Sequence, residues 1–334
     1  MAEMILGVEI GGTKQQLALG TTEGEILALR RGHVDPELGA DGIRYWLKEN
    51  IPDFIEEQKE DKGFAAPKAI GCGFGGPINS LKGRVLRSFQ IEGWLDFPIQ
   101  DWFEATFELP AIVDNDSNAA AWAEYVRGFG RGTQNFFYTN IGSGVGGGFV
   151  FDGRLYDGQG YGAGELGHTL APDFTATASG AVEKVENLCS GWSVEQRLHT
   201  PGYIPETSAL FRPVAGELAA ISTRDLGEAA RAGDNFALTE IGWVARTFGI
   251  ALVNVLSLTN VERIAIGGGV ANLGDVLIDP IRETVEKRVF ASSQGHYEIR
   301  ACELGEEIVL VGALLRAGAR LACRERWRFI GSGG

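Results

Sequence analysis

The chain has 334 residues, 44% of them hydrophobic and 22% charged, which is normal for a soluble globular protein and long enough for two domains. Its formal net charge of −14 and its pI near 4.9 argue against binding to nucleic acids or anionic membranes, because such a surface repels both. An anionic ligand must then be held by backbone dipoles, by Lys14 or by a metal ion.

The cysteines and the start of the chain indicate the compartment. The four cysteines stand far apart and none forms a CxxC pair: Cys72, Cys189, Cys302 and Cys323. This predicts buried free thiols in a reducing compartment rather than disulfides or a zinc site. An apolar strand follows Glu3 directly, which predicts no signal peptide. No apolar run approaches the ~20 residues of a membrane span, so we expect a cytoplasmic protein.

Hydrophobic periodicity predicts alternating strands and helices in the first 125 residues. The expected strands are 4–9, 15–20, 26–31, 68–74 and 111–113, and the expected helices are 41–57, 99–107 and 118–125. Pro52 is expected to break or kink the first helix, and 56–63 to form a charged, solvated turn. Asp116 or Ser117 can cap the helix at 118–125. Asp116 follows a strand, where α/β sheets bind ligands.

Residues 136–168 hold a glycine-rich hairpin followed by a polar pair. An apolar strand at 136–141 runs into GSGVGGG, and a second strand at 149–151 ends at the tight turn Asp152-Gly153. Glycines permit positive φ and close approach of backbone N–H groups to a phosphate. Glu165 and His168 follow within one turn of each other, which suggests phosphoryl transfer to a hydroxylated substrate. A purely structural hairpin stays open, because glycine loops without a lysine are weak motifs.

A second glycine hairpin lies near the start of the chain. Residues 10–14 read IGGTK between two short apolar strands, which repeats the pattern at 142–148. Such an internal duplication is informative, because one loop can hold each side of a polyphosphate.

The second half predicts further strand–helix units. Residues 169–182 form a polar connection, and 200–224, with three prolines, form a long loop or insertion. The expected helices are 183–196, 225–232, 235–256, 275–290 and 308–324, and the expected strands are 261–266 and 299–302.

Six segments together resemble the ROK (repressor, ORF, kinase) family of sugar kinases in the actin-like ATPase superfamily. These are EIGGTK at 9–14, DNDSNAAAWAE at 114–124, NIGSGVGGG at 140–148, GAGELGH at 162–168, ENLCSG at 186–191 and IAIGGGV at 264–270. The resemblance implies two actin-like (ribonuclease H-like) α/β domains around a central cleft, 1–118 plus 308–334 and 119–307. It also implies a terminal helix that crosses back onto the first domain, and a homodimer.

The resemblance also implies roles for particular residues. Asp116 would be the general base of phosphoryl transfer, against the alternative that it only caps a helix. The sugar contacts would be Asn115, Glu165, His168, Glu186 and Gln90, with Glu183 as an alternative to Glu186. The phosphate loops would be Gly11, Gly12, Thr13 and Lys14, and Gly142, Ser143 and Gly144. Gly268 and Gly269 would lie against adenosine, and Mg²⁺ would bridge the phosphates of ATP.

Three departures from the family pattern limit what the resemblance implies. Residues 169–185 contain no cysteine where a structural zinc site is usual, so we expect no structural zinc, and Phe174 and Trp192 would fix this region by packing. Glu9 replaces the usual Asp, which hints at a ketose, and Gln90 replaces the usual Asn.

The favoured function is therefore an ATP-dependent hexose kinase, of the glucokinase type first. The alternatives are a fructokinase or an N-acetylhexosamine kinase, a catalytically silent sugar-sensing regulator, and an actin-like polymer subunit. Family repressors carry an N-terminal DNA-binding domain, and the first strand at Met4 leads us to expect none here.

Overall fold

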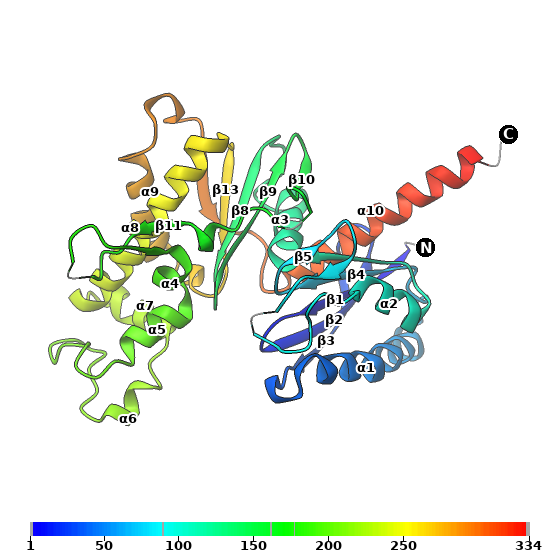
Figure 1. Ribbon diagram of the computed structural model, residues 1–334, viewed down its shortest axis with the longest axis horizontal. Helices are drawn as coiled ribbons and strands as arrows, with labels where there is room; N and C mark the ends of the chain where they lie inside the picture. The colour runs from blue at the N-terminus through cyan, green and yellow to red at the C-terminus, as the bar shows by residue number, and fades with distance from the viewer. Residues whose placement is uncertain (1–2, 89, 161, 177, 332–334) are drawn as a thin grey trace.

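The computed structural model describes residues 3–88, 90–160, 162–176 and 178–331 and contains two five-stranded sheets in two halves of the molecule (Figure 1). The first sheet has the order β3-β2-β1-β4-β7. Its strands are β1 (Met4–Ile10), β2 (Lys14–Thr21), β3 (Ile26–His33), β4 (Ile70–Phe74) and β7 (Ala111–Asn115). The first three are antiparallel, and β1, β4 and β7 are parallel.

The second sheet repeats this arrangement, with the order β10-β9-β8-β13-β14. Its strands are β8 (Phe136–Ile141), β9 (Val145–Phe151), β10 (Arg154–Tyr156), β13 (Arg263–Gly267) and β14 (Glu298–Ala301). An antiparallel meander is again followed by two parallel strands. The predicted α/β fold with a repeated glycine hairpin is therefore confirmed.

Helices cover both faces of each sheet. They are α1 (Gly39–Lys62), α2 (Ile99–Phe107), α3 (Asp116–Arg127), α4 (Val185–Cys189), α5 (Gly191–Leu198), α6 (Ala215–Leu218), α7 (Thr223–Arg231), α8 (Asn235–Thr259), α9 (Asp275–Glu286) and α10 (Ile308–Gly331). The chain also forms two small antiparallel hairpins. In one, β5 (Ile78–Asn79) pairs with β6 (Arg84–Val85), and in the other β11 (Leu170–Pro172) pairs with β12 (Val182–Lys184). Short 3₁₀ helices span Pro36–Leu38, Leu166–His168, Ala271–Leu273 and Ala291–Ser293.

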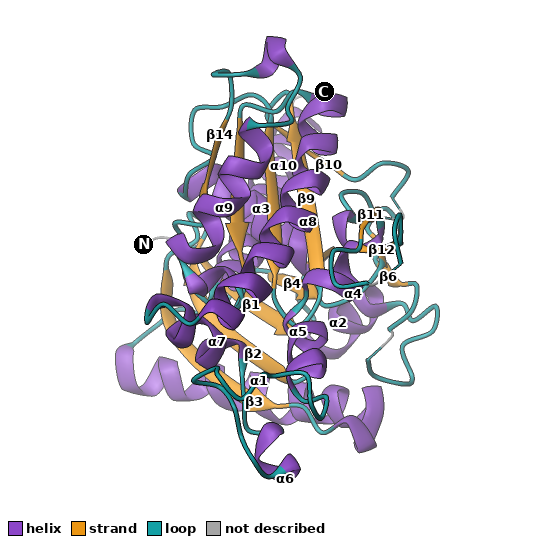
Figure 2. Cartoon of the chain, turned by 90° about the vertical axis from the view of Figure 1, so that its left-hand side faces the viewer, coloured by secondary structure: helices purple, strands orange, loops and turns teal. Residues whose placement is uncertain are grey.

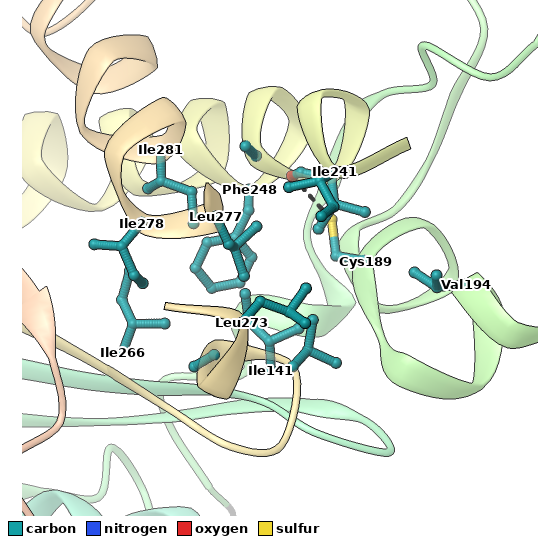
Figure 3. Packing of buried hydrophobic residues seen from close by; sticks show 14 of the residues in the cluster. Ile141, Cys189, Val194, Ile241, Phe248, Ile266, Leu273, Leu277, Ile278 and Ile281 are labelled. Atoms are coloured by element: carbon teal, nitrogen blue, oxygen red, sulfur yellow. Dashed lines mark hydrogen bonds between the residues drawn. The ribbon is translucent and has the colours of Figure 1, made fainter. Parts of the chain in front are cut away.

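Alternate residues of β8 face opposite cores. Phe137 and Ile141 pack with α8 and α9, whereas Phe136 and Tyr138 pack with the alanines of α3. In Figure 2, α8 and α9 lie in front of the second sheet, and Figure 3 shows their apolar side chains meeting around Phe248. By length and composition α8 is apolar enough to span a membrane, contrary to our expectation, but 56% of its apolar window is buried in this core.

The terminal helix α10 returns to the first sheet. Leu314 and Ala317 are buried against Ile5, and a Cβ atom on Gly71 would lie 1.9 Å from the carbonyl oxygen of Ala313. Glycine in β4 therefore lets the helix backbone approach the sheet closely. Arg316 donates two hydrogen bonds, of 2.9 and 3.3 Å, to the carboxylate of buried Asp114. This ion pair ties α10 to the end of β7.

Several predicted elements have different limits. The helix α1 runs through Pro52 and through 56–62, because Pro52 lies on its exposed side, where water can satisfy the carbonyl group that it leaves unpaired. The cap of α3 is Asn115, not Asp116 or Ser117. Residues 169–182 contain β11 and part of β12, and 183–196 divide into β12, α4 and α5. In 200–224, α6 forms, and Ile204, Leu210, Leu218 and Ile221 are buried in the core.

The cysteine prediction is partly right. Cys72 and Cys189 are buried free thiols, and Figure 3 shows Cys189 directed at α8, where its Sγ donates to the carbonyl of Val244. Cys302 is a free thiol but only half-buried. The side chain of Cys323 lies outside the described residues.

Candidate active site

A cleft between the two sheets contains two adjoining compartments. The β13–β14 compartment has a volume of about 550 Å³ and is lined at the ends of these strands by Gly267, Gly268, Gly269, Cys302, Leu304 and Gly305. The β4–β7 compartment has a volume of about 560 Å³ and is lined by Gly75, Gly76, Asn115, Glu165, His168 and Glu186. Glu9, Lys14, Asp116, Ser117 and Asn140 line both and so mark their junction.

The topology explains why the compartments form here. Each contains the carboxyl ends of two adjacent parallel strands, which is where open α/β sheets bind ligands. Because the two sheets share one strand order, β4 and β7 in one half correspond to β13 and β14 in the other. The two compartments are therefore equivalent positions of a repeated fold.

Two hairpin loops line the β4–β7 compartment beside the junction. Loop 1 (residues 10–14) joins β1 to β2, and loop 2 (residues 141–145) joins β8 to β9. Within the described part of the chain, the backbone N–H groups of Gly12, Thr13, Ser143 and Gly144 have no hydrogen-bond partner. Four free donors around one cavity are suited to an anion such as a polyphosphate.

Gly142 differs from its neighbours in loop 2. Its N–H donates to the carbonyl of Gly144 at 2.8 Å, and its own carbonyl accepts from Gly191 at 2.7 Å. Ser143 and Gly144 line the cavity, whereas Gly142, predicted to be part of the phosphate loop, closes the turn.

Two loop glycines, Gly12 and Gly144, lie in crowded positions, and backbone conformation does not require glycine at either. None of Gly11, Gly12, Gly142 or Gly144 has positive φ, contrary to our expectation. A Cβ atom on Gly12 would lie 1.7 Å from Oε1 of Gln90, and one on Gly144 would lie 2.6 Å from Oε2 of Glu186. Gly268 does have positive φ, at +90°, and packs against the carbonyl of Ile141.

Asp116 is the first residue of α3 and lies at the junction. Asn115 caps the helix through Oδ1, which accepts from the N–H groups of Ser117 and Asn118. Asp116 Oδ1 accepts from the N–H of Ser117 at 2.7 Å. Burial raises the pKa of Asp116 to about 6, the charges of Glu9 and Glu165 add to this, and the bonds from Ser117 oppose it. The carboxylate is thus a weak base poised near neutral pH.

The other predicted polar residues surround the β4–β7 compartment. Asn115 Nδ2 donates to the carbonyl of Gly76 at 3.1 Å, so its amide is already committed to the cap and to this turn. Glu165 precedes the 3₁₀ helix Leu166–His168, His168 is its last residue, and both line the compartment. Burial raises the pKa of Glu165, the Glu186 carboxylate reinforces the rise, and His168 opposes it.

Glu186 and Glu183 occupy different positions relative to the β4–β7 compartment. Glu186 lines the compartment, and its Oε2 accepts from the N–H of Val145 at 2.8 Å, which anchors loop 2. Glu183 instead accepts from Asn187 Nδ2 at 3.0 Å and lies outside both compartments. Gln90 covers Gly12 and also lines the compartment, and its contact with a substrate stays a prediction.

Comparison with known proteins gives the family of this chain. Residues 5–319 match the ROK family. The chain belongs to the ROK family. It is 32% identical to a glucokinase of Halalkalibacterium halodurans over 311 residues, 92% of each chain. It is 30% identical to a glucokinase of Thermotoga maritima, over 92% of this chain and 95% of that one.

The fold agrees with this assignment. A crystal structure of a ROK family glucokinase from Streptomyces griseus in complex with glucose and AMPPNP superimposes with a TM-score of 0.77 at 29% identity. The match covers 94% of this chain and 99% of that chain. The cleft described above is therefore the cleft of a ROK protein.

The segment 169–185 packs against α8. Among the described residues, no group of three or more His, Cys, Asp and Glu is arranged to hold a metal ion. Phe174 instead packs 4.0 Å beneath the guanidinium of Arg246, and Thr247 donates to the carbonyl of Pro172 at 3.2 Å. The predicted role of Trp192 is wrong, because its side chain is 47% exposed.

Sequence reasoning missed four contributors to this ROK cleft. Ser117 and Asn140 lie at the junction, and Tyr138 and residues 301–306 line the β13–β14 compartment. Asn140 directly precedes loop 2 in the sequence, but only the fold brings it next to Ser117. The approach of 301–306 depends on β14, which is distant in sequence from β13 and gives no local signal.

Proposed function

We propose that this chain is an ATP-dependent hexose kinase that transfers the γ-phosphoryl group of ATP to a sugar hydroxyl, with glucose as the first candidate. The observation that carries the proposal is the position of Asp116. Its carboxylate lies where two compartments meet, between two loops with free N–H donors. Phosphoryl transfer needs this combination of positioning, charge neutralisation and a proton acceptor.

The two compartments would hold different substrates. The sugar would occupy the β4–β7 compartment, and adenosine would lie along Gly268 and Gly269 in the β13–β14 compartment. The phosphates would then cross the junction, and loops 1 and 2 would offer their N–H groups to them from the β4–β7 compartment. The open space over Gly269, where a Cβ atom would meet nothing within 4 Å, suits close contact with a nucleoside.

Asp116 would accept the proton of the sugar hydroxyl as it attacks the phosphoryl group. With a pKa of about 6, Asp116 is about nine-tenths ionised at pH 7. A base with this pKa is both available and strong enough to assist the transfer. Asn115 would keep the carboxylate in place through the cap of α3.

Lys14 and a magnesium ion would neutralise the phosphates. The Lys14 side chain is half-exposed at the junction, and its Nζ is 3.2 Å from Oε1 of Glu9. Mg²⁺ prefers oxygen ligands and keeps several waters. The acidic residue Glu9 lines the same space, so the junction suits a hydrated Mg²⁺ held by phosphate oxygens and water. The ion would supply charge neutralisation during transfer.

The sugar would be recognised by matched polar groups. Glu165, His168 and Glu186 supply acceptors and a donor around one compartment, with Asn115 and Gln90 opposite. Such sites discriminate well, because a hydroxyl of the wrong configuration leaves a polar group unpaired. Fructose or an N-acetylhexosamine remains the alternative substrate, since Glu9 and Gln90 depart from the usual family residues. A silent sugar-sensing regulator is less well supported, because the base and both loops are present.

Three further properties belong to this proposal. The domain boundaries would be 1–118 plus 308–334 and 119–307, with closure around the sugar to exclude water. Small-angle scattering profiles that do not change on adding sugar would argue against closure. The protein would be a cytoplasmic homodimer that binds neither nucleic acid nor membrane, and sedimentation with nucleotide would separate a dimer from an actin-like polymer.

The test is a substrate panel. ATP-dependent phosphorylation should be measured with glucose, fructose, mannose, N-acetylglucosamine and N-acetylmannosamine, with Mg²⁺ present and with a zinc-specific chelator added. We expect one strongly preferred sugar and no effect of the chelator. No turnover with any sugar would refute the hexose kinase, and calorimetric binding of a sugar without turnover would support the regulator.

A further inference from the structure

Two residues with no role assigned above form a contact between α3 and β8 beside Asp116. Ser117 belongs to α3 and is 8% exposed, while Asn140 belongs to β8 and precedes loop 2. The Ser117 Oγ atom is 3.1 Å from Asn140 Oδ1 and 3.3 Å from Asp116 Oδ1. One hydroxyl therefore has two acceptors, one on α3 and one on β8.

Space for this contact is provided by a glycine. A Cβ atom on Gly146 would lie 2.3 Å from Ser117 Oγ and 3.0 Å from Asn140 Oδ1. Any side chain at this position of β9 would displace both groups. The glycine that follows loop 2 is thus explained by the approach of Ser117 to Asn140, and not by phosphate binding.

The hydroxyl of Ser117 carries a single proton and so can donate to one acceptor at a time. While Asp116 is ionised, the hydroxyl is drawn to the carboxylate, because hydrogen bonds to a charged acceptor are stronger. Once Asp116 has taken the sugar's proton, that attraction falls, and Asn140 Oδ1 offers an alternative acceptor at 3.1 Å. The hydroxyl can therefore rotate as the base changes its charge.

Asn140 connects this rotation to loop 2. Its Oδ1 faces Ser117, and its Nδ2 lies 3.8 Å from where a Cβ atom of Gly142 would be. In the described part of the chain no hydrogen-bond acceptor is found for Nδ2. The amide thus directs a free donor at the edge of loop 2, where the proposed phosphates would lie.

We propose that Ser117 and Asn140 are a positioning pair that orients the Asp116 carboxylate and links it to loop 2. Ser117 holds the ionised base for attack and passes its hydrogen bond to Asn140 when the base is protonated. This inference rests on the kinase activity proposed above and deepens it.

The charged groups around Asp116 must be included in any test based on pH. Glu9 and Lys14 face it from the first sheet, and Glu165, His168 and Glu186 face it across the β4–β7 compartment. None of these groups bonds to Ser117. A change that follows removal of the Ser117 hydroxyl can therefore be assigned to the pair.

The experiment compares Ser117→Ala, Asn140→Ala and the double variant with the parent. The control is Ser193→Ala, which removes another buried hydroxyl from the first turn of a helix, where it bonds only the Ser190 carbonyl. For Ser117→Ala we expect kcat to fall about tenfold with KM within twofold, and the acid limb of the kcat profile to move up by about one pH unit, since one charge-assisted bond is lost. The control should show neither change.

The double variant tests the linkage. Because the two residues act together, we expect it to cost no more than the larger single change. If the fold-losses of kcat in the two single variants multiplied in the double variant, the pair would be refuted. It would also be refuted if Ser117→Ala were active and the acid limb of its kcat profile did not move. Neither result would count against the kinase activity.

An inactive parent protein would instead refute the kinase activity. The pKa of Asp116 can then be obtained from stability. The free energy of unfolding is compared with and without Asp116→Asn as a function of pH, first in the parent and then in Ser117→Ala. The pair predicts a higher pKa without the hydroxyl, and an unchanged pKa would refute it.

Discussion

The replacement Asp116→Asn should have opposite effects on activity and on stability. It keeps the shape of the side chain and an oxygen that can accept from the N–H of Ser117, but it removes the base. We expect kcat to fall by about 10²–10⁴-fold, which is the usual contribution of a general base, with sugar and nucleotide binding retained. Turnover close to that of the parent would remove Asp116 as the base.

The stability effect follows from the raised pKa. Burial holds the pKa of Asp116 at about 6 instead of 3.8. Ionisation of this group is therefore less favourable in the folded protein than in the unfolded chain, and it lowers the free energy of unfolding. The full difference corresponds to about 3 kcal/mol at neutral pH, and partial exposure to the cleft reduces it to ~2 kcal/mol. An asparagine side chain carries no charge, so the Asp116→Asn variant should be more stable than the parent by this amount.

The pH dependence gives the decisive comparison. The cost of the charge is complete above pH 6, decreases as the pH falls through 6, and is absent below 3.8. Unfolding by urea at pH 7.5 and at pH 4 should therefore show a stabilised variant at the first pH and near-equal proteins at the second. An advantage of the variant that did not depend on pH, or no advantage at pH 7.5, would refute the reasoning.

Three further changes test other parts of the cleft. Arg316→Ala leaves the Asp114 carboxylate buried without its partner, so it should lower the free energy of unfolding by about 3 kcal/mol in urea titrations; a loss below 1 kcal/mol would contradict the buried pair. Glu186→Ala removes the acceptor for Val145 N–H, so KM for the sugar should rise about tenfold or more, whereas Glu183→Ala should change it less than twofold; equal effects would contradict the assignment. A zinc-specific chelator should leave turnover and Tm unchanged while removal of Mg²⁺ abolishes turnover, and a fall in Tm with the zinc chelator would reveal a structural zinc.

Local patterns were sufficient for much of the fold. The limits of α2 were predicted to the residue, because its apolar spacing is regular and Pro98 and Glu108 bound it. Pro52 misled the prediction, since periodicity does not say whether a proline ring faces water. Asn115 was missed as the cap, because Asp116 and Ser117 are equally good capping residues and only the backbone conformation decides between them.

In the candidate site, too, some residues could be predicted from local sequence and others could not. Residues on glycine loops were found from sequence because the motif is contiguous. Ser117, Asn140 and Tyr138 were not, because each reaches the cleft only through the pairing of β8 with β9 and β13 and the packing of α3 on the second sheet. The loop glycines were expected for their conformational freedom, but none of them has positive φ, and Gly12 and Gly144 instead leave room for Gln90 and Glu186.

The repeated strand order has a consequence for the direction of the proposed reaction. If the two halves were identical, each would offer the same strand ends and the same loop. A phosphate chain between them could then bind in either direction. The halves differ at an important equivalent place, because β7 is followed by Asp116 and β14 by Cys302. A carboxylate directly after only one of these two strands is enough to decide which ligand becomes the acceptor and which the donor.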